Sequence, residues 1–217
     1  MRTGYELDVT SFARASSTAR AFRIPATSVV HGFVGALEAQ RDAWTLQAWW
    51  NPSRRQGWRA WGRPGDYSPR HHDFQRYGVT VSRTVSLRPA LASRVETAWM
   101  SGRDLDRFSR YSFNSFDNRL HGYPTASIRY DRGAVLRSVT SVGRRGLRLD
   151  GFADLALVRD RGFGDAYRGY PGTGAAVELP GPLRSLVSLE WGYGFNGIRE
   201  RGGKGTQTIR VTGYRMF

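Results

Sequence analysis

The feature that most constrains the fold is an alternation of apolar and polar side chains between residues 183 and 195, in which Leu186 is the only misfit. One face carries Leu183, Ser185, Val187, Leu189, Trp191, Tyr193 and Phe195, and the other carries Arg184, Ser188, Glu190, Gly192 and Gly194. A period of two is that of a β-strand and not of a helix. Similar alternation recurs near residues 5–10, 29–39, 44–50, 77–88, 91–99, 128–131, 147–157 and 208–212. The sequence therefore predicts an all-β chain of about ten antiparallel strands in one domain, residues 1–217.

The polar faces of these strands favour a membrane barrel over a soluble sandwich. They carry charges of both signs and glycine, which suits a water-filled lumen, and the stretch from 183 ends in three aromatic residues, as an interfacial girdle would. The chain has no run of 18 apolar residues, which excludes helical membrane spans but not strands. We therefore expect an antiparallel transmembrane β-barrel in a bacterial outer membrane, in contact with membrane lipid and lipopolysaccharide. A soluble sandwich, which also alternates, is the alternative.

The gaps between the expected strands are uneven in length. The gaps at residues 88–90 and 180–182 are short and contain proline, which is typical of tight turns. Residues 51–73 and 101–124 are long enough to form extended loops. Short turns at one rim and long loops at the other are the asymmetry of outer-membrane barrels.

The charge of the chain admits two explanations. The formal net charge is +15 and the isoelectric point is about 11.1, values that often indicate nucleic-acid binding. The positive residues are mostly arginines scattered along the chain, which equally suits a barrel with arginine in its lumen and at its rims. We expect no nucleic-acid partner, and keep a soluble basic nucleic-acid-binding β-protein as a less favoured alternative.

The residue inventory does not point to catalysis. The chain has no cysteine, which excludes disulfides and thiolate metal sites. The only metal-like cluster is His71-His72-Asp73, in which adjacent histidines of an extended segment point in opposite directions. Gly-x-Ser-x-Gly and Walker-type loops are also absent. We therefore predict no enzyme, no cofactor and no metal site.

Three segments, taken in order, resemble a known family. They are Arg119-Leu120-His121-Gly122-Tyr123-Pro124, Gly151-Phe152-Ala153-Asp154, and the stretch from Gly172-x-Gly174 through Leu179-Pro180-Gly181-Pro182 to Arg184. Their order and spacing are similar to those in the C-terminal part of the BamA-type outer-membrane assembly factors, the bacterial surface antigen family. The resemblance covers about residues 75–217.

The resemblance implies a larger assembly than this chain contains. The family's barrel has sixteen strands, so about ten strands here would be its C-terminal part, and no periplasmic POTRA repeats are recognisable. The N-terminus lacks the apolar region of a signal peptide, and we expect the chain to be the end of a longer precursor. The missing strands would come from that precursor or from a partner chain, unless the chain closes as a smaller barrel.

The implied function is insertion of barrel proteins into the outer membrane, or passage of polypeptides across it. Its clients would be unfolded barrel proteins or secreted polypeptides. A passive outer-membrane pore or a small structural barrel is the alternative.

The resemblance also assigns site residues. Arg119, His121, Gly122 and Tyr123 would form the tip of a loop that folds back into the lumen, with Asp154 as its partner. The family's tip arginine falls on His121, which leaves three possibilities: His121 donates to Asp154, Arg119 takes that role, or His121 only packs in the loop.

The last expected strand runs from about Gly205 to Phe217, and Gly213, Tyr214 and Phe217 are its candidate residues. It would form a weakly closed seam with the first strand, where an incoming strand pairs by β-augmentation. Gly213 would weaken that edge, since glycine destabilises a strand.

Overall fold

The chain forms a single antiparallel sheet of eleven strands. The computed structural model describes residues 1–16, 18–24, 27–57, 62, 72–106, 108–113, 119–124, 128–144, 147–160, 166–182, 185–197 and 205–215. The strands are β1 (Arg2–Thr10), β2 (Ser28–Arg41), β3 (Trp44–Gln56), β4 (Asp73–Arg88), β5 (Leu91–Arg103), β6 (Tyr111–Ser112), β7 (Arg129–Arg144), β8 (Leu147–Asp160), β9 (Tyr167–Pro180), β10 (Ser185–Gly194) and β11 (Thr206–Arg215). Each strand pairs with its sequence neighbours, except that β5 pairs with β7 and the short β6 lies beside β7. The prediction of an all-β antiparallel chain is confirmed.

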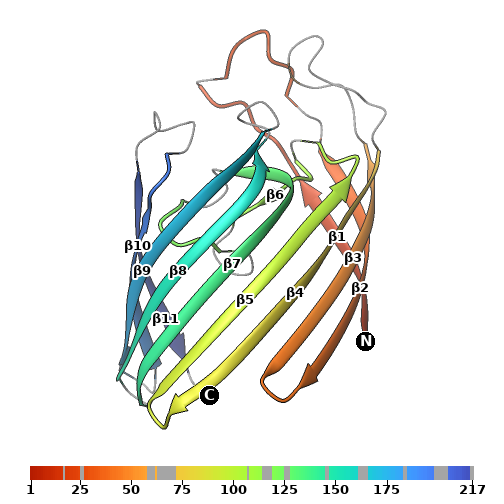
Figure 1. The fold of residues 1–217 in the computed structure, drawn as a ribbon. Coiled ribbons are helices and arrows are strands. Elements are labelled where there is room, and N and C mark those ends of the chain that lie inside the picture. Colours follow the sequence, from red (N-terminus) through yellow and green to blue (C-terminus); the bar gives the residue numbers. More distant parts are fainter. Residues whose placement is uncertain are drawn as a thin grey trace.

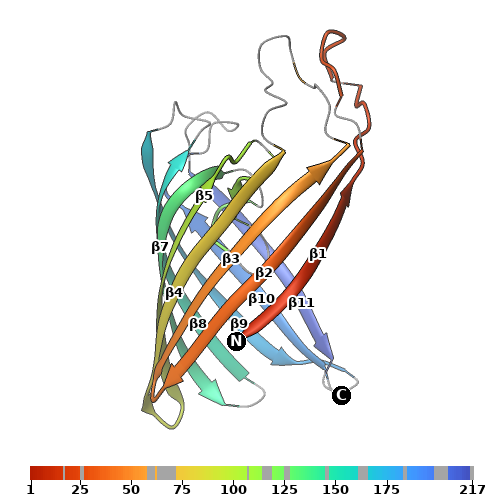
Figure 2. The same cartoon turned by 90° about the vertical axis from the view of Figure 1, so that its right-hand side faces the viewer.

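The connections at the two ends of the sheet differ in length, as predicted. Tight turns join β2 to β3 and β4 to β5, and Pro180-Gly181-Pro182 separates β9 from β10 (Figure 1). The sequence gaps after β1, β3 and β5 are longer, and these three strands end at the opposite rim (Figure 2). The loop expected at 51–73 begins later, because β3 continues through Gln56. The inward residues in this part of β3 are the polar Asn51, Ser53 and Arg55, and the sequence analysis therefore assigned them to a loop.

The two faces of the sheet differ in chemistry. The convex face exposes large apolar side chains, which include Leu7, Phe33, Leu46, Val79, Trp99, Leu136, Leu155, Leu189 and Ile209. The concave face carries the acidic residues Asp150, Asp154 and Glu190, all buried. Strand alternation thus sorts apolar residues outward and charged residues inward, the reverse of a soluble sheet that packs a core on one side. The described residues form no helix that is long and apolar enough to span a membrane.

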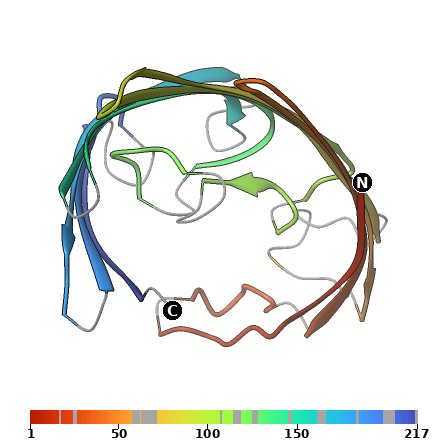
Figure 3. The same ribbon diagram turned by 90° about the horizontal axis from the view of Figure 1, so that it is seen from below.

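The sheet curves around an interior but does not close. Within the part of the chain that the structure describes, β1 pairs only with β2 and β11 pairs only with β10. Viewed from below, the strands follow an arc whose two ends stay apart (Figure 3). The described residues therefore do not form the smaller closed barrel that the sequence left as an alternative. The ten long strands in the arc agree with the expected number of about ten.

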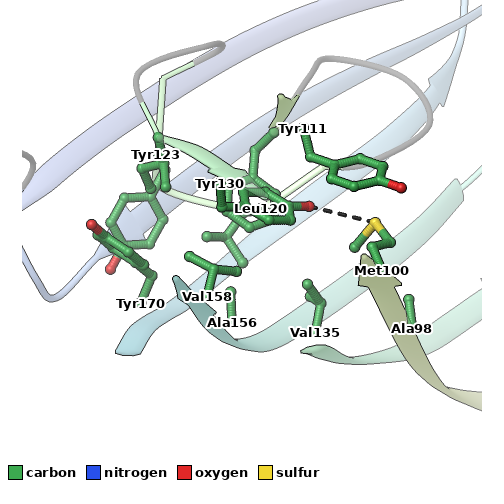
Figure 4. Close-up of a cluster of buried hydrophobic side chains, with 12 residues drawn as sticks. Ala98, Met100, Tyr111, Leu120, Tyr123, Tyr130, Val135, Ala156, Val158 and Tyr170 are labelled. Atoms are coloured by element: carbon green, nitrogen blue, oxygen red, sulfur yellow. Dashed lines mark hydrogen bonds between the residues drawn. The ribbon is translucent and has the colours of Figure 1, made fainter. Parts of the chain in front are cut away.

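The segment between β5 and β7 lies inside the arc and forms the apolar core. Tyr111, Phe113, Leu120 and Tyr123 of this segment are buried against the concave face, where they meet apolar residues of the wall (Figure 4). The wall residues of this cluster are Ala98 and Met100 of β5, Tyr130 and Val135 of β7, Ala156 and Val158 of β8, and Tyr170 of β9. We call the described residues of this segment, 104–106, 108–113, 119–124 and 128, the internal loop. The sheet thus has its apolar core on the concave side only where this loop covers it.

Candidate functional site

The internal loop is fastened to the wall at its beginning by an ion pair. Arg55 of β3 donates from Nη1 and Nη2 to the two carboxylate oxygens of Asp106, at 2.7 and 2.8 Å. Asp106 Oδ1 also accepts hydrogen bonds from the backbone N–H groups of Phe108 and Ser109, each at 3.0 Å. A bidentate arginine–carboxylate pair fixes both distance and orientation. The loop therefore leaves the rim in one defined direction.

A tyrosine holds the middle of the internal loop. The hydroxyl of Tyr111 donates to the carbonyl of Ser101 at 2.7 Å and accepts from the backbone N–H of Tyr77 at 3.0 Å. Its ring stacks on Tyr130 with centroids 5.5 Å apart. Tyr111 thus connects the loop to β4, β5 and β7. Nothing in the local sequence distinguished it, because its partners lie 10 to 34 residues away.

At the tip of the loop, His121 binds Asp154 of β8. The backbone N–H of His121 donates to Asp154 Oδ2 at 2.8 Å, and the Nδ1 atom of its ring lies 2.6 Å from the same oxygen. Because a carboxylate only accepts, Nδ1 is the donor. The ring also lies flat on Phe152, with centroids 4.0 Å apart and planes 7° apart. Of the three possibilities left by the sequence, the structure selects His121 as the partner of Asp154.

Arg119 binds a different acid. Its guanidinium pairs with Glu190 of β10, and its carbonyl accepts a hydrogen bond from Arg137 Nε at 2.8 Å. Arg137 in turn pairs with Glu96 of β5 at 3.0 Å. Burial lowers the pKa of Arg119 to about 10, which leaves the group charged at neutral pH. The suggestion that Arg119 replaces the tip arginine toward Asp154 is wrong, since Arg119 and His121 bind carboxylates on two different strands.

Gly122 lies where no side chain fits. Its φ of +82° belongs to the left-handed region, and an added Cβ would lie 2.1 Å from the backbone N of Gly194. Its carbonyl accepts a hydrogen bond from Thr206 Oγ1 of β11. The tip backbone therefore lies directly on β10 and reaches the last strand.

Three wall glycines accommodate this close approach. An added Cβ would lie 2.3 Å from the His121 carbonyl at Gly172, 2.5 Å from the Gly122 nitrogen at Gly192, and 2.6 Å from the Tyr123 ring at Gly194. We call Gly172, Gly192 and Gly194 the glycine floor. The sequence analysis placed Gly192 and Gly194 on the polar face of their strand and Gly172 in a segment of the family resemblance, but assigned none of the three to the site. Their recurrence at inward positions of paired strands was the available signal.

Tyr123 completes the tip. Its hydroxyl donates to the carbonyl of Pro171 at 2.7 Å and accepts from the backbone N–H of Asn196 at 3.2 Å. Its ring meets Tyr170 edge to face, with centroids 5.5 Å apart. Burial raises the pKa of Tyr123, so the hydroxyl keeps its proton at neutral pH.

We call the loop tip, residues 119–123, together with its partners Asp154 and Glu190, the lock. His121 Nε2 lies 4.0 Å from Glu190 Oε1, so the ring lies between the carboxylates of Asp154 and Glu190. Beside the tip, a cavity of about 230 Å³ is lined by Arg119, Glu190, Thr208 and Arg210 among others. No group of three or more metal-binding side chains occurs among the described residues. The arrangement holds the loop against β8, β9, β10 and β11.

The candidate residues of the last strand lie apart from the lock. Gly213 faces outward opposite Val187, and an added Cβ there would touch nothing within 4 Å. Tyr214 is exposed on the inward face opposite Leu186. Phe217 lies outside the described residues, as does His71 of the histidine pair. Packing therefore does not explain the glycine at 213.

Comparison of the chain with protein-family models, with curated proteins and with solved structures found no match.

Proposed function

We propose that this chain forms part of the wall of a bacterial outer-membrane barrel that inserts barrel proteins or passes polypeptides across the membrane. The apolar convex face and the charged concave face support a wall between lipid and an aqueous interior. The order of loop tip, aspartate strand and glycine-bearing strand pair is similar to that of the BamA-type assembly factors.

The observation that carries the proposal is the locked internal loop next to a free strand edge. His121–Asp154 and Arg119–Glu190 hold the tip, and Gly122 contacts β11. Unfilled lateral hydrogen-bonding groups on an edge strand form a template for another strand. A client strand would add to such an edge while the internal loop blocks free passage through the interior.

A reconstitution experiment tests this function. The full chain is folded into liposomes, and the folding rate of a small unfolded barrel protein is measured against empty liposomes of the same lipid. We expect faster folding with the chain present and little acceleration with Asp154→Ala, which loses the lock. Asp73→Ala, which removes an exposed carboxylate at the start of β4 away from the lock and from both edges, is the matched control. No acceleration by the unaltered chain would contradict the proposal.

A passive pore is the second candidate, favoured by one observation. A cavity of about 520 Å³ beside the internal loop is lined by Glu6, Arg76, Glu96, Arg110 and Arg137 among other residues. A charged interior of this kind suits ion conduction. Large, steady conductance in planar bilayers without any effect on client folding would favour the pore.

Nucleic-acid binding has less support. Many of the arginines on the concave face pair with carboxylates, as in Arg55–Asp106, Arg137–Glu96 and Arg148–Asp150. Such pairing offsets charge that would otherwise attract phosphate. A chain that dissolves without detergent and binds DNA with a steep salt dependence would overturn the membrane proposal.

A further inference from the structure

The two edge strands of the sheet are complementary in direction and in chemistry. β1 runs from the rim of short turns toward the rim of long loops, and β11 runs the opposite way (Figure 2). They contain 9 and 10 residues, so they match in length. Placed side by side they would form an antiparallel pair, the arrangement found throughout this sheet.

The faces of the two edges also match. β1 directs Tyr5, Leu7 and Val9 outward, and β11 directs Ile209 and Val211 outward. All five are more than half exposed, and Ile209 reaches 75%. Pairing the edges would continue the apolar convex surface without interruption.

The inward faces have opposite charges. On β1 they carry Glu6 and Asp8, and on β11 they carry Arg210 between Thr208 and Thr212. Opposite charges on neighbouring strands favour their pairing and select against like-charged partners. The edge of β1 thus fits the edge of β11 better than it fits a second β1.

The internal loop contacts the wall from β3 to β11, and the arc is packed around it. It contacts β3 through Arg55, β4 and β5 through Tyr111, β8 through Asp154, β10 through Glu190 and β11 through Thr206. Packed interiors resist compression, so tightening the arc would require repacking this loop. A second chain covers both edges and leaves the arc unchanged.

We propose that two copies of this chain pair edge to edge, with β11 of each copy hydrogen-bonded to β1 of the other. A two-fold axis parallel to the arc's own axis preserves strand direction and produces both junctions at once. The ten long strands of each copy would then form one closed barrel of twenty strands, an even number within the range of outer-membrane barrels. Closure would satisfy the edge hydrogen bonds that lipid cannot satisfy. This inference rests on the proposed membrane function.

Cysteine cross-linking tests the pairing, because the chain has no native cysteine. Full-length chains carrying Leu7→Cys are folded in detergent with differently sized, tagged chains carrying Ile209→Cys, Val211→Cys or Gly213→Cys, and then mildly oxidised. We expect a covalent dimer of one chain of each kind for at least one of the three positions. Leu157→Cys, which faces outward in the middle of the sheet, is the control and should give none. Mixed dimers show that the junction lies between chains.

The same cysteines placed in one chain distinguish the alternatives. An internal disulfide in Leu7→Cys/Val211→Cys monomers, without mixed dimers, would show self-closure and overturn the proposal. Absence of any cross-link would also overturn it, and would leave the edges to strands of another chain. Asp8→Lys should weaken the dimer about 3- to 10-fold by placing like charges at the junction. Detergent-dependent monomers that still accelerate client folding would refute the dimer alone, whereas solubility without detergent would refute the membrane function itself.

Discussion

Strands β1 and β8 show what the internal loop contributes, because both alternate between apolar and charged residues but only one is buried. β1 is exposed along almost its whole length on both faces. β8 exposes Leu155 and Leu157 outward, while Asp154, Ala156 and Val158 on its inward face are buried. The difference is that the tip of the internal loop lies against β8, whereas the core cluster of described residues contains none from β1. Alternation therefore sets the two faces, and loop packing decides where a core forms.

The largest expected effect on the stability of the buried strand β8 is that of Asp154→Ala. The change removes the acceptor of the His121 backbone N–H and of its ring Nδ1, and leaves a buried donor without its partner. We expect a loss of about 3–5 kcal/mol in the free energy of unfolding, because two hydrogen bonds to a carboxylate are lost and each contributes about 1.5–3 kcal/mol. Denaturant titration of the chain in detergent measures it. Asp8→Ala on β1 should change little, and equal effects at the two positions would contradict the contrast.

Outward residues should behave alike on both strands. Leu155→Arg on β8 and Leu7→Arg on β1 each place a charge on the convex face. In a bilayer we expect each to cost about 2–4 kcal/mol if it lies near the midplane. Unfolding in lipid vesicles measures both costs. A negligible cost for both would show that the convex face is not in contact with lipid.

A pair of glycines sharpens the contrast between the lock and the free edge. Gly122→Ala brings a methyl group against Gly194 at a positive φ, whereas Gly213→Ala meets open space. We expect Gly122→Ala to cost about 2 kcal/mol and to expose the internal loop to protease, and Gly213→Ala to leave both unchanged. Limited proteolysis followed by mass spectrometry measures cleavage within the internal loop. Cleavage of the Gly213→Ala chain at the internal loop would contradict this assignment.

The smallest expected effect is that of Tyr123→Phe. The ring stays on the glycine floor, and the hydrogen bonds to Pro171 and Asn196 are lost. We expect a cost of about 1 kcal/mol, because each neutral hydrogen bond contributes modestly. Tyr167→Phe, at an exposed position of β9, is the matched control in the same denaturant titration. If Tyr123→Phe lowered the free energy of unfolding as much as Asp154→Ala does, the tyrosine hydroxyl would be a main contributor to the stability of the lock.

The candidate site was predictable only in part. The tip residues and Asp154 were found through a family resemblance, and the structure does bring Arg119, His121, Gly122, Tyr123 and Asp154 into one region. The choice of His121 over Arg119 for Asp154 was open, because residues two apart in an irregular loop have no fixed relative direction. The glycine floor and the partner Glu190 of Arg119 were missed for a related reason. Alternation states which face a residue is on, and not which distant segment covers that face.

By itself the sequence determined the all-β class, the two faces of each strand, the turn at 88–90 and the unequal rims, because strand periodicity and turn chemistry are local properties. Only the tertiary structure decided that the arc stays open, that His121 binds Asp154 while Arg119 binds Glu190, and that the apolar core lies under the internal loop. These outcomes depend on contacts between residues 33 to 84 positions apart. Such contacts follow from how a loop packs into a curved sheet, which no local period encodes.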